Sequence, residues 1–148
     1  MAADKPITRV RDSELDFDDE LFYRWCGAPF TGIGYEDIPG TGLSEISYRY
    51  GVQEGPARDW YPSGVLKGES CFRENMLHGA SREYAEDGTL ITEALHEYGI
   101  LVQRRERDRS GNLVTTFALR PDSDTYPLLE RYRREKGWPS NGSFDQPG

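Results

Sequence analysis

The chain has 148 residues, of which 36% are hydrophobic and 30% charged, and it carries a formal net charge of −8. This composition is typical of one folded, water-facing domain, and the negative charge argues against binding to nucleic acid or to an anionic membrane surface. No stretch approaches the roughly 18 consecutive apolar residues that cross a bilayer. The first residues also lack the apolar core of a secretory signal, so we expect a cytoplasmic protein.

Residues 1–20 are predicted to form an acidic lead-in, in which Leu15 and Phe17 are the apolar anchors. Its carboxylates are Asp12, Glu14, Asp16, Asp18, Asp19 and Glu20. One interpretation is a solvated lead-in strand, because like charges on a sheet edge prevent association between sheets. The other is an anionic surface that attracts a basic partner. In the second interpretation the partner-binding residues are Asp16, Asp18, Asp19 and Glu20.

Residues 21–120 contain a repeat, and the two clearest copies are segments 55–66 and 79–90. At an offset of 24 the matching pairs are Gly55/Gly79, Arg58/Arg82, Trp60/Tyr84, Gly64/Gly88 and Leu66/Leu90. A third copy, offset by 23, places Arg105 under Arg82, but Val102 replaces its glycine and Arg107 its aromatic residue. A looser first copy ends at Gly42-Leu43. Such a fixed period indicates an array of about four similar units.

Each unit is predicted to be a β-hairpin. Ser63-Gly64, Asp87-Gly88 and Ser110-Gly111 are signals for two-residue primed turns, and the flanking segments alternate bulky with small or polar side chains. Gly51 and Asn75, also 24 apart, are expected to reverse the chain at the opposite edge because both residue types tolerate left-handed backbone. The fold class is therefore mainly β, an elongated antiparallel sheet whose repeat glycines permit close approach between strands.

These segments resemble the bacterial variant of the MORN repeat. The resemblance rests on residues 55–66, on residues 79–90 and on the earlier sequence Gly27-Ala-Pro-Phe-Thr-Gly32. It covers about two thirds of the chain and departs from the pattern at Arg107. The resemblance implies a sheet of consecutive hairpins, and many proteins with this repeat are identified as the antitoxin half of toxin–antitoxin pairs.

Residues 121–139 are predicted to be a helix that caps the array. Asp124 or Thr125 can cap it, Pro127 suits its first turn, and Gly137 followed by Pro139 ends it. Its apolar side would consist of Leu128, Leu129 and Tyr132. Because a repeat array needs a cover for its final open edge, we interpret this helix as a cap first. Residues 140–148 are expected to be a flexible tail.

A search for chemistry finds no catalytic residues, no metal site and no cofactor motif. Cys26 and Cys71 are predicted to be buried reduced thiols, and His78 and His96 belong to no recognised nucleophile or zinc pattern. The arginines at positions 105, 107 and 109 share one face of a strand, and we interpret them as solvated rather than as a phosphate site. Trp60 and Tyr84 are predicted core residues. Tyr61, Trp25 and Trp138 are predicted exposed anchors, and Tyr61 joins the partner-binding set.

Three functional hypotheses remain. The first is an immunity or antitoxin protein that binds a cognate protein toxin, of basic character, and occludes it by steric and electrostatic blocking. The second is a general protein–protein interaction scaffold with an unrelated partner. The third is an enzyme or a lipid-binding protein, which the missing motifs and the negative charge count against. The fold alone does not choose among them.

Overall fold

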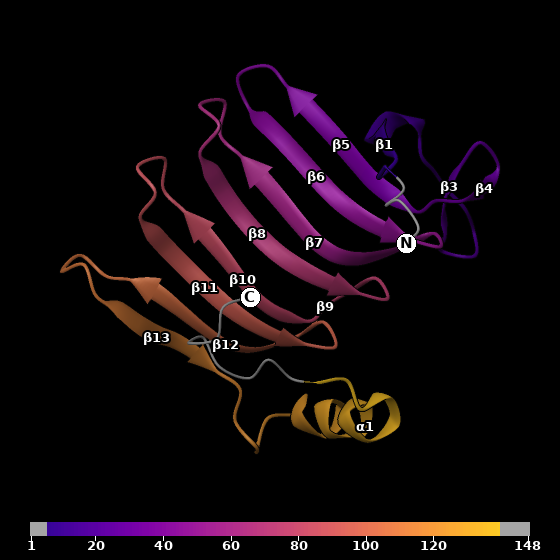
Figure 1. Cartoon of the computed structure of the whole chain (residues 1–148). Helices are drawn as coiled ribbons and strands as arrows, with labels where there is room; N and C mark the ends of the chain where they lie inside the picture. Colours follow the sequence, from indigo (N-terminus) through magenta and orange to yellow (C-terminus); the bar gives the residue numbers. More distant parts are fainter. Residues whose placement is uncertain (1–5, 140–148) are drawn as a thin grey trace, which may run out of the picture.

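The protein is a long, curved sheet of consecutive hairpins, seen in a computed structural model that describes residues 6–139. Its strand order is β1-β5-β6-β7-β8-β10-β11-β12-β13, with β9 beside β8. The strands are β1 (Arg9–Arg11), β5 (Gly32–Ile38), β6 (Gly42–Arg49), β7 (Val52–Trp60), β8 (Leu66–Arg73), β9 (Met76–Leu77), β10 (Gly79–Tyr84), β11 (Leu90–Glu97), β12 (Ile100–Arg107) and β13 (Leu113–Ala118). Apart from the parallel pair β1–β5, neighbours are antiparallel (Figure 1). The predicted fold class is confirmed.

A second, three-stranded sheet lies at the N-terminal end. It consists of β2 (Asp16–Phe17), β3 (Tyr23–Trp25) and β4 (Ala28–Pro29), after a short 3-10 helix η1 (Asp12–Glu14). A hydrophobic cluster joins this end of the chain to strands β1 and β6 of the main sheet, and it is formed by buried Val10, Phe30 and Tyr48, against which Leu15, Tyr23 and Ile46 pack. The first repeat unit therefore sends its opening strands into a separate small sheet, and Leu15 anchors the acidic segment as expected.

The two edges of the main sheet use different turns. At one edge both central residues of each turn have positive φ, as in Tyr50-Gly51, Glu74-Asn75 and Tyr98-Gly99, which is the signature of a two-residue primed turn. This confirms the predicted reversals at Gly51 and Asn75.

At the other edge the predicted primed turns at Ser63-Gly64, Asp87-Gly88 and Ser110-Gly111 are wrong. Only the glycine of each pair has positive φ. In the first of these turns Gly64 N–H donates to the Tyr61 carbonyl at 2.8 Å, and Tyr61 N–H donates to Val65 at 2.9 Å. This is a three-residue loop closed by a left-handed glycine, so the preceding serine or aspartate keeps ordinary backbone.

Gly55 and Gly79 occupy bulges, with φ of +103° and +111°. Between the pairs Ile46–Ala57 and Tyr48–Gln53, strand β7 contains more residues than β6, and Gly55 lies in that excess. A Cβ added at Gly55 would approach Ser47 Cβ to 3.3 Å. In the last unit the register moves only from Leu95–Gln103 to His96–Leu101, so a single residue, Val102, is extra. The smaller bulge explains why Val102 stands where earlier units have glycine. It also explains why the last copy of the repeat is offset by 23 residues instead of 24.

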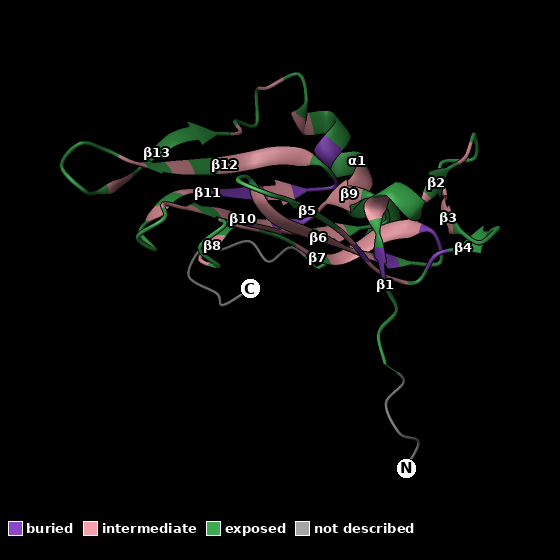
Figure 2. Ribbon diagram, turned by 90° about the horizontal axis from the view of Figure 1, so that it is seen from above, coloured by how far each residue is buried: buried purple, intermediate pink, exposed green. Residues whose placement is uncertain are grey.

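Helix α1 (Tyr126–Lys136) begins after Thr125, which makes no side-chain capping bond, and ends at left-handed Gly137. Leu129 is fully buried, whereas Leu128 remains 37% exposed and does not share the packed side as predicted. The Tyr132 ring stacks on Tyr98 at 5.5 Å between centroids. The helix thus caps the turn end of hairpin β11–β12, while the last strand, β13, is exposed along most of its length (Figure 2). The predicted tail, 140–148, lies outside the described residues.

Candidate partner-binding face

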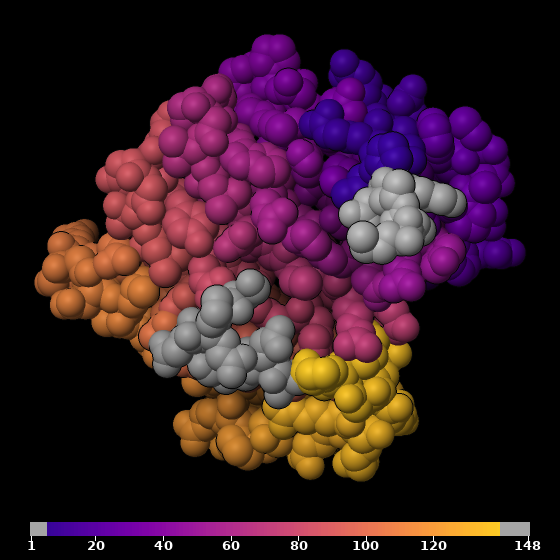
Figure 3. All heavy atoms as spheres, in the orientation of Figure 1, coloured from indigo at the N-terminus to yellow at the C-terminus, as the bar shows by residue number. Residues whose placement is uncertain are grey.

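Strand pairing gives the main sheet two chemically different faces, because residues directly opposite each other share a face. Figure 3 shows the hairpins side by side as bands in chain order, with helix α1 beside the last of them. One row of cross-strand partners alternates in charge on six neighbouring strands. We call this row the charge ladder, and its members are Glu45, Arg58, Glu69, Arg82, Glu93 and Arg105. The face that carries it is the ladder face.

Ion pairs neutralise much of the charge ladder. Arg58 lies 3.8 Å from Glu69, and Arg82 lies 3.9 Å from Glu69 and 3.4 Å from Glu93. Arg105 also binds Glu93, whose side chain is only 3% exposed. The ladder is therefore a structural device that satisfies a nearly buried carboxylate.

Arg105 and Arg107 are structural as well, which corrects their interpretation as solvated residues, whereas Arg109 is exposed and follows the end of β12. Arg105 is half-buried on Glu93. Arg107, at the repeat's aromatic position, donates to the Leu90 carbonyl at 2.6 Å and to the Gly111 carbonyl at 2.5 Å. Its guanidinium thus joins the start of β11 to the turn before β13.

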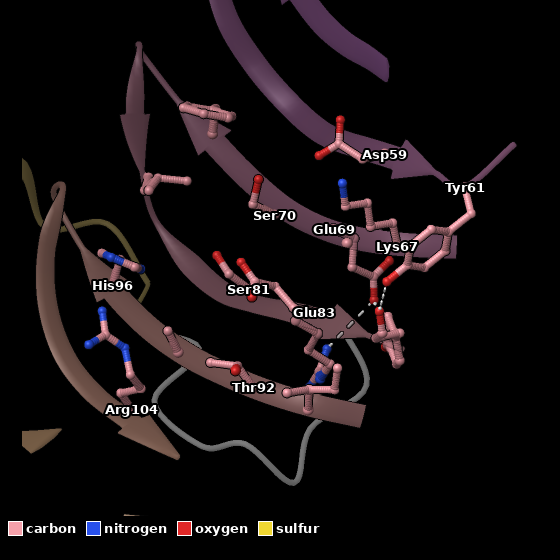
Figure 4. Close-up of a pocket in the computed structure, with 17 residues that line it drawn as sticks. Asp59, Tyr61, Lys67, Glu69, Ser70, Ser81, Glu83, Thr92, His96 and Arg104 are labelled. Carbon is pink, nitrogen blue, oxygen red and sulfur yellow. Dashed lines mark hydrogen bonds and ion pairs between the residues drawn. The ribbon is translucent and has the colours of Figure 1, made fainter. Parts of the chain in front are cut away.

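The opposite face carries a hollow of about 530 Å³ over strands β7 to β12. We call it the hollowed face. Its floor is a row of small side chains: Ala57 and Ser70 are paired, the register of β8 and β10 continues to Ser81, and Ser81 pairs with Ala94. Figure 4 shows Ser70 and Ser81 in the middle of the hollow. Small residues on four successive strands leave the space that bulky side chains would fill.

The ends of the hollow differ in chemistry. Asp59, Lys67 and Glu83 lie toward one end, and His96 and Arg104 toward the other (Figure 4). The Nδ1 atom of His96 is buried and has no hydrogen-bond partner among residues 6–139. Burial, together with the Arg104 charge, lowers the pKa of His96, so this imidazole is neutral at pH 7.

A row of carboxylates crosses the hollowed face beside the floor. Continuous pairing runs through Glu36–Ser44, Ser44–Asp59, Asp59–Gly68, Gly68–Glu83, Glu83–Thr92 and Thr92–Glu106. We call Glu36, Asp59, Glu83 and Glu106 the acidic row. All four are exposed. Within residues 6–139 none of them forms an ion pair, in contrast to the carboxylates of the charge ladder.

The predicted partner-binding residues are not brought together. Asp16 lies in β2 of the small sheet, whereas Tyr61 follows β7 of the main sheet. Asp16, Asp19 and Glu20 are exposed, but Asp18 is half-buried and binds the Arg24 side chain. Asp18 also accepts backbone N–H groups from Phe22 at 2.9 Å and Glu20 at 3.0 Å. The Arg24 hydrogen bond, followed by these backbone contacts, holds the pKa of Asp18 below its usual range.

Tyr61 lines the hollow and is half-buried rather than an exposed anchor. Its hydroxyl donates to the Tyr84 carbonyl at 2.7 Å, which holds the ring against the neighbouring hairpin. Trp138 is also packed, with its ring 5.0 Å from that of Tyr98. Trp25 is 36% exposed, in agreement with its predicted position.

The predicted burial of both cysteines is wrong, since Cys26 and Cys71 are exposed free thiols. Cys26 occupies a two-residue turn with a φ of +51°, and Cys71 lies on an uncovered part of strand β8. His78, by contrast, is buried: its Nδ1 accepts the Tyr98 N–H at 3.0 Å and its Nε2 donates to the Pro139 carbonyl at 2.8 Å. His78 therefore fastens the chain after α1 to the sheet.

Comparisons with known proteins give no relative from which a function can be inferred, so the functional proposal rests on the residues of this chain. No protein-family model matches the chain, and no curated protein matches it significantly. Among residues 6–139, no three histidine, cysteine or acidic side chains are arranged to hold a metal ion. The helix within the same range is too short and too polar to span a membrane.

Sequence reasoning missed both rows of charge and the small floor, although the repeat contained the signal. Glu45, Glu69 and Glu93 are spaced by 24, as are the floor pairs Ala57/Ser81 and Ser70/Ala94. The acidic row follows the same period to within one residue. Aligning every column of the repeat, rather than only glycines and aromatics, would have found all three.

Proposed function

We propose that this protein is an immunity or antitoxin-type inhibitor that binds a partner protein on its hollowed face and blocks it. The observation that carries the proposal is the hollow itself, a concave surface of about 530 Å³ that extends across strands β7 to β12. Concave surfaces with a few convergent polar groups are the usual places where proteins bind other molecules. The acidic row beside the hollow favours a basic partner, which suits a toxin that acts on nucleic acid.

The mechanism is blocking by occupancy, with no turnover by this chain. The partner covers the hollow, and the same contact shields the partner's own active surface from its substrate. The resemblance to bacterial MORN-repeat antitoxins supports this proposal over that of a scaffold with an unrelated partner. A scaffold would bind the same face and leave the partner's activity unchanged.

The decisive experiment titrates the purified chain against a candidate toxin domain and follows the toxin's activity. Blocking predicts an end point at one equivalent that moves in proportion to toxin concentration. Protection at a hundredth of an equivalent would instead mean that the chain modifies the toxin or its product. Binding without loss of toxin activity would favour the scaffold.

A further inference from the structure

The acidic row has a geometry that specifies what kind of segment it can hold. Its members lie on β5, β7, β10 and β12, so every second strand of the sheet contributes one carboxylate. Neighbouring strands are about 4.8 Å apart, so successive carboxylates are separated by about 10 Å along a line across the strands.

The row is set apart from the other charges of the sheet. On the ladder face each acidic group from Glu45 to Glu93 has an arginine within 4 Å. On the hollowed face Ser44 donates a hydrogen bond to Asp59, but no ion pair within residues 6–139 involves the row. The basic side chains that reach the hollow are Lys67 on β8, between Asp59 and Glu83, Arg104 at the far end, and Arg82, which is engaged by the charge ladder. The row therefore keeps most of its negative charge.

The shape of the hollow is a second observation, independent of the charge of the acidic row, that favours binding of an extended segment. Its floor of small residues, from Ala57 to Ala94, runs across the strands and parallel to the acidic row. A polypeptide segment laid along this floor would present one side to Asp59 and Glu83, and its continuation across β5 and β12 would reach Glu36 and Glu106. Interfaces gain specificity when opposite charges meet in such fixed positions.

We propose that the hollowed face binds a basic segment of the partner protein, laid across the strands through the hollow, with lysine or arginine side chains spaced by about two strand widths to meet Glu36, Asp59, Glu83 and Glu106. Arg104 pairs with Ala94 and so lies at the β12 end of the floor, where it repels a positive group. This inference rests on the proposed binding function and names the chemistry of the segment that binds.

The test uses the full chain, labelled with nitrogen-15, and two peptide probes of identical composition. The spaced probe is (Lys-Pro-Pro)4, a polyproline helix that places one lysine about every 9 Å. The clustered probe is Lys4Pro8, which has the same charge in one block. Titration followed by amide chemical shifts locates each probe on the protein.

The expected result is that the spaced probe shifts amides on strands β7 to β12 around the row and floor, and binds more tightly than the clustered probe. Glu83→Gln with Glu106→Gln should weaken its binding roughly three- to tenfold at low salt. The charge-matched control, Asp16→Asn with Asp19→Asn, should weaken it by no more than about twofold, because it loses only long-range attraction. Dispersed amide spectra confirm that both variants fold.

The proposal is overturned if the spaced probe does not bind, or shifts mainly amides of residues 16–20. It is equally overturned if the clustered probe binds as well, or if the row variant binds as tightly as the control. None of these results depends on the toxin titration, so the proposed inhibition could stand while this choice of segment fails.

Discussion

Glu93 accepts a hydrogen bond from Arg82 at 3.4 Å across the β10–β11 pair, although its side chain is only 3% exposed. A carboxylate so far removed from water is stable only while charged partners surround it, and Arg105 provides the second. This relationship places the nearly buried ion pairs of the sheet on the ladder face. The other face is left available for contact with a partner.

Replacing Glu93 with glutamine should destabilise the fold by about 3 kcal/mol, because two arginines lose the carboxylate that they share. Urea unfolding measures the difference. The matched control is Glu83→Gln on the adjacent strand and the opposite face. Since Glu83 is exposed and forms no ion pair within the described chain, its substitution should change stability by no more than about 0.5 kcal/mol. Equal effects at both positions would remove the distinction between the faces.

Replacing Gly55 with valine should destabilise by about 2 kcal/mol or more, since a φ of +103° is strained for any side chain and Ser47 Cβ lies 3.3 Å from the new Cβ. Gly64 offers the control, because it has a φ of +91° with open space around it. Asparagine should be tolerated better at Gly64 than at Gly55. Thermal melts of Gly55→Val, Gly55→Asn and Gly64→Asn measure these differences in stability. A wild-type melting temperature for Gly55→Val would contradict the argument that the bulge needs glycine.

His96 should titrate below its usual pKa of about 6.5, because burial disfavours the imidazolium and Arg104 repels it. A histidine whose pKa is depressed in the folded state supports the fold fully above about pH 6.5. That support is lost as the pH falls from there toward the folded pKa. A proton NMR titration of the ring gives the midpoint directly. A midpoint at or above 6.5 would show that the imidazole is solvated.

Neutralising Asp16, Asp19 and Glu20 together should slow association with a basic partner at low ionic strength and leave folding intact. The effect should fade at physiological salt, where the screening length is about 8 Å. Asp18 is kept, because it fastens the loop through Arg24 and Phe22. Surface plasmon resonance at two salt concentrations measures both rates. An unchanged association rate at low salt would mean that these carboxylates do not steer the partner.

The sequence was sufficient for the hairpin array because turn residues act locally. Positive φ at Gly51 and Asn75 requires a residue that tolerates left-handed backbone, and both positions were identified. The turn types at the other edge were harder to predict, since Ser63-Gly64 suits two different loops and only the neighbouring hydrogen bonds distinguish them.

The site was less predictable, because it depends on cross-strand neighbours that are distant in the sequence. Asp16 and Tyr61 are plausible interface residues when taken singly, but they belong to different sheets. The acidic row becomes visible only when Asp59 and Glu83 are known to face the same Gly68. Tyr61 looked exposed from its position after Trp60, and a hydrogen bond to the next hairpin holds it instead.

The most direct test of the central claim is the partner's equilibrium affinity for two charge-matched variants, Glu83→Gln with Glu106→Gln and Asp16→Asn with Asp19→Asn. Binding on the hollowed face predicts that the first variant loses affinity at physiological salt through faster dissociation, by tenfold or more, while the second stays within about twofold of the wild type. The reverse order, or equal losses in both, would place the interface away from the hollow and contradict this account.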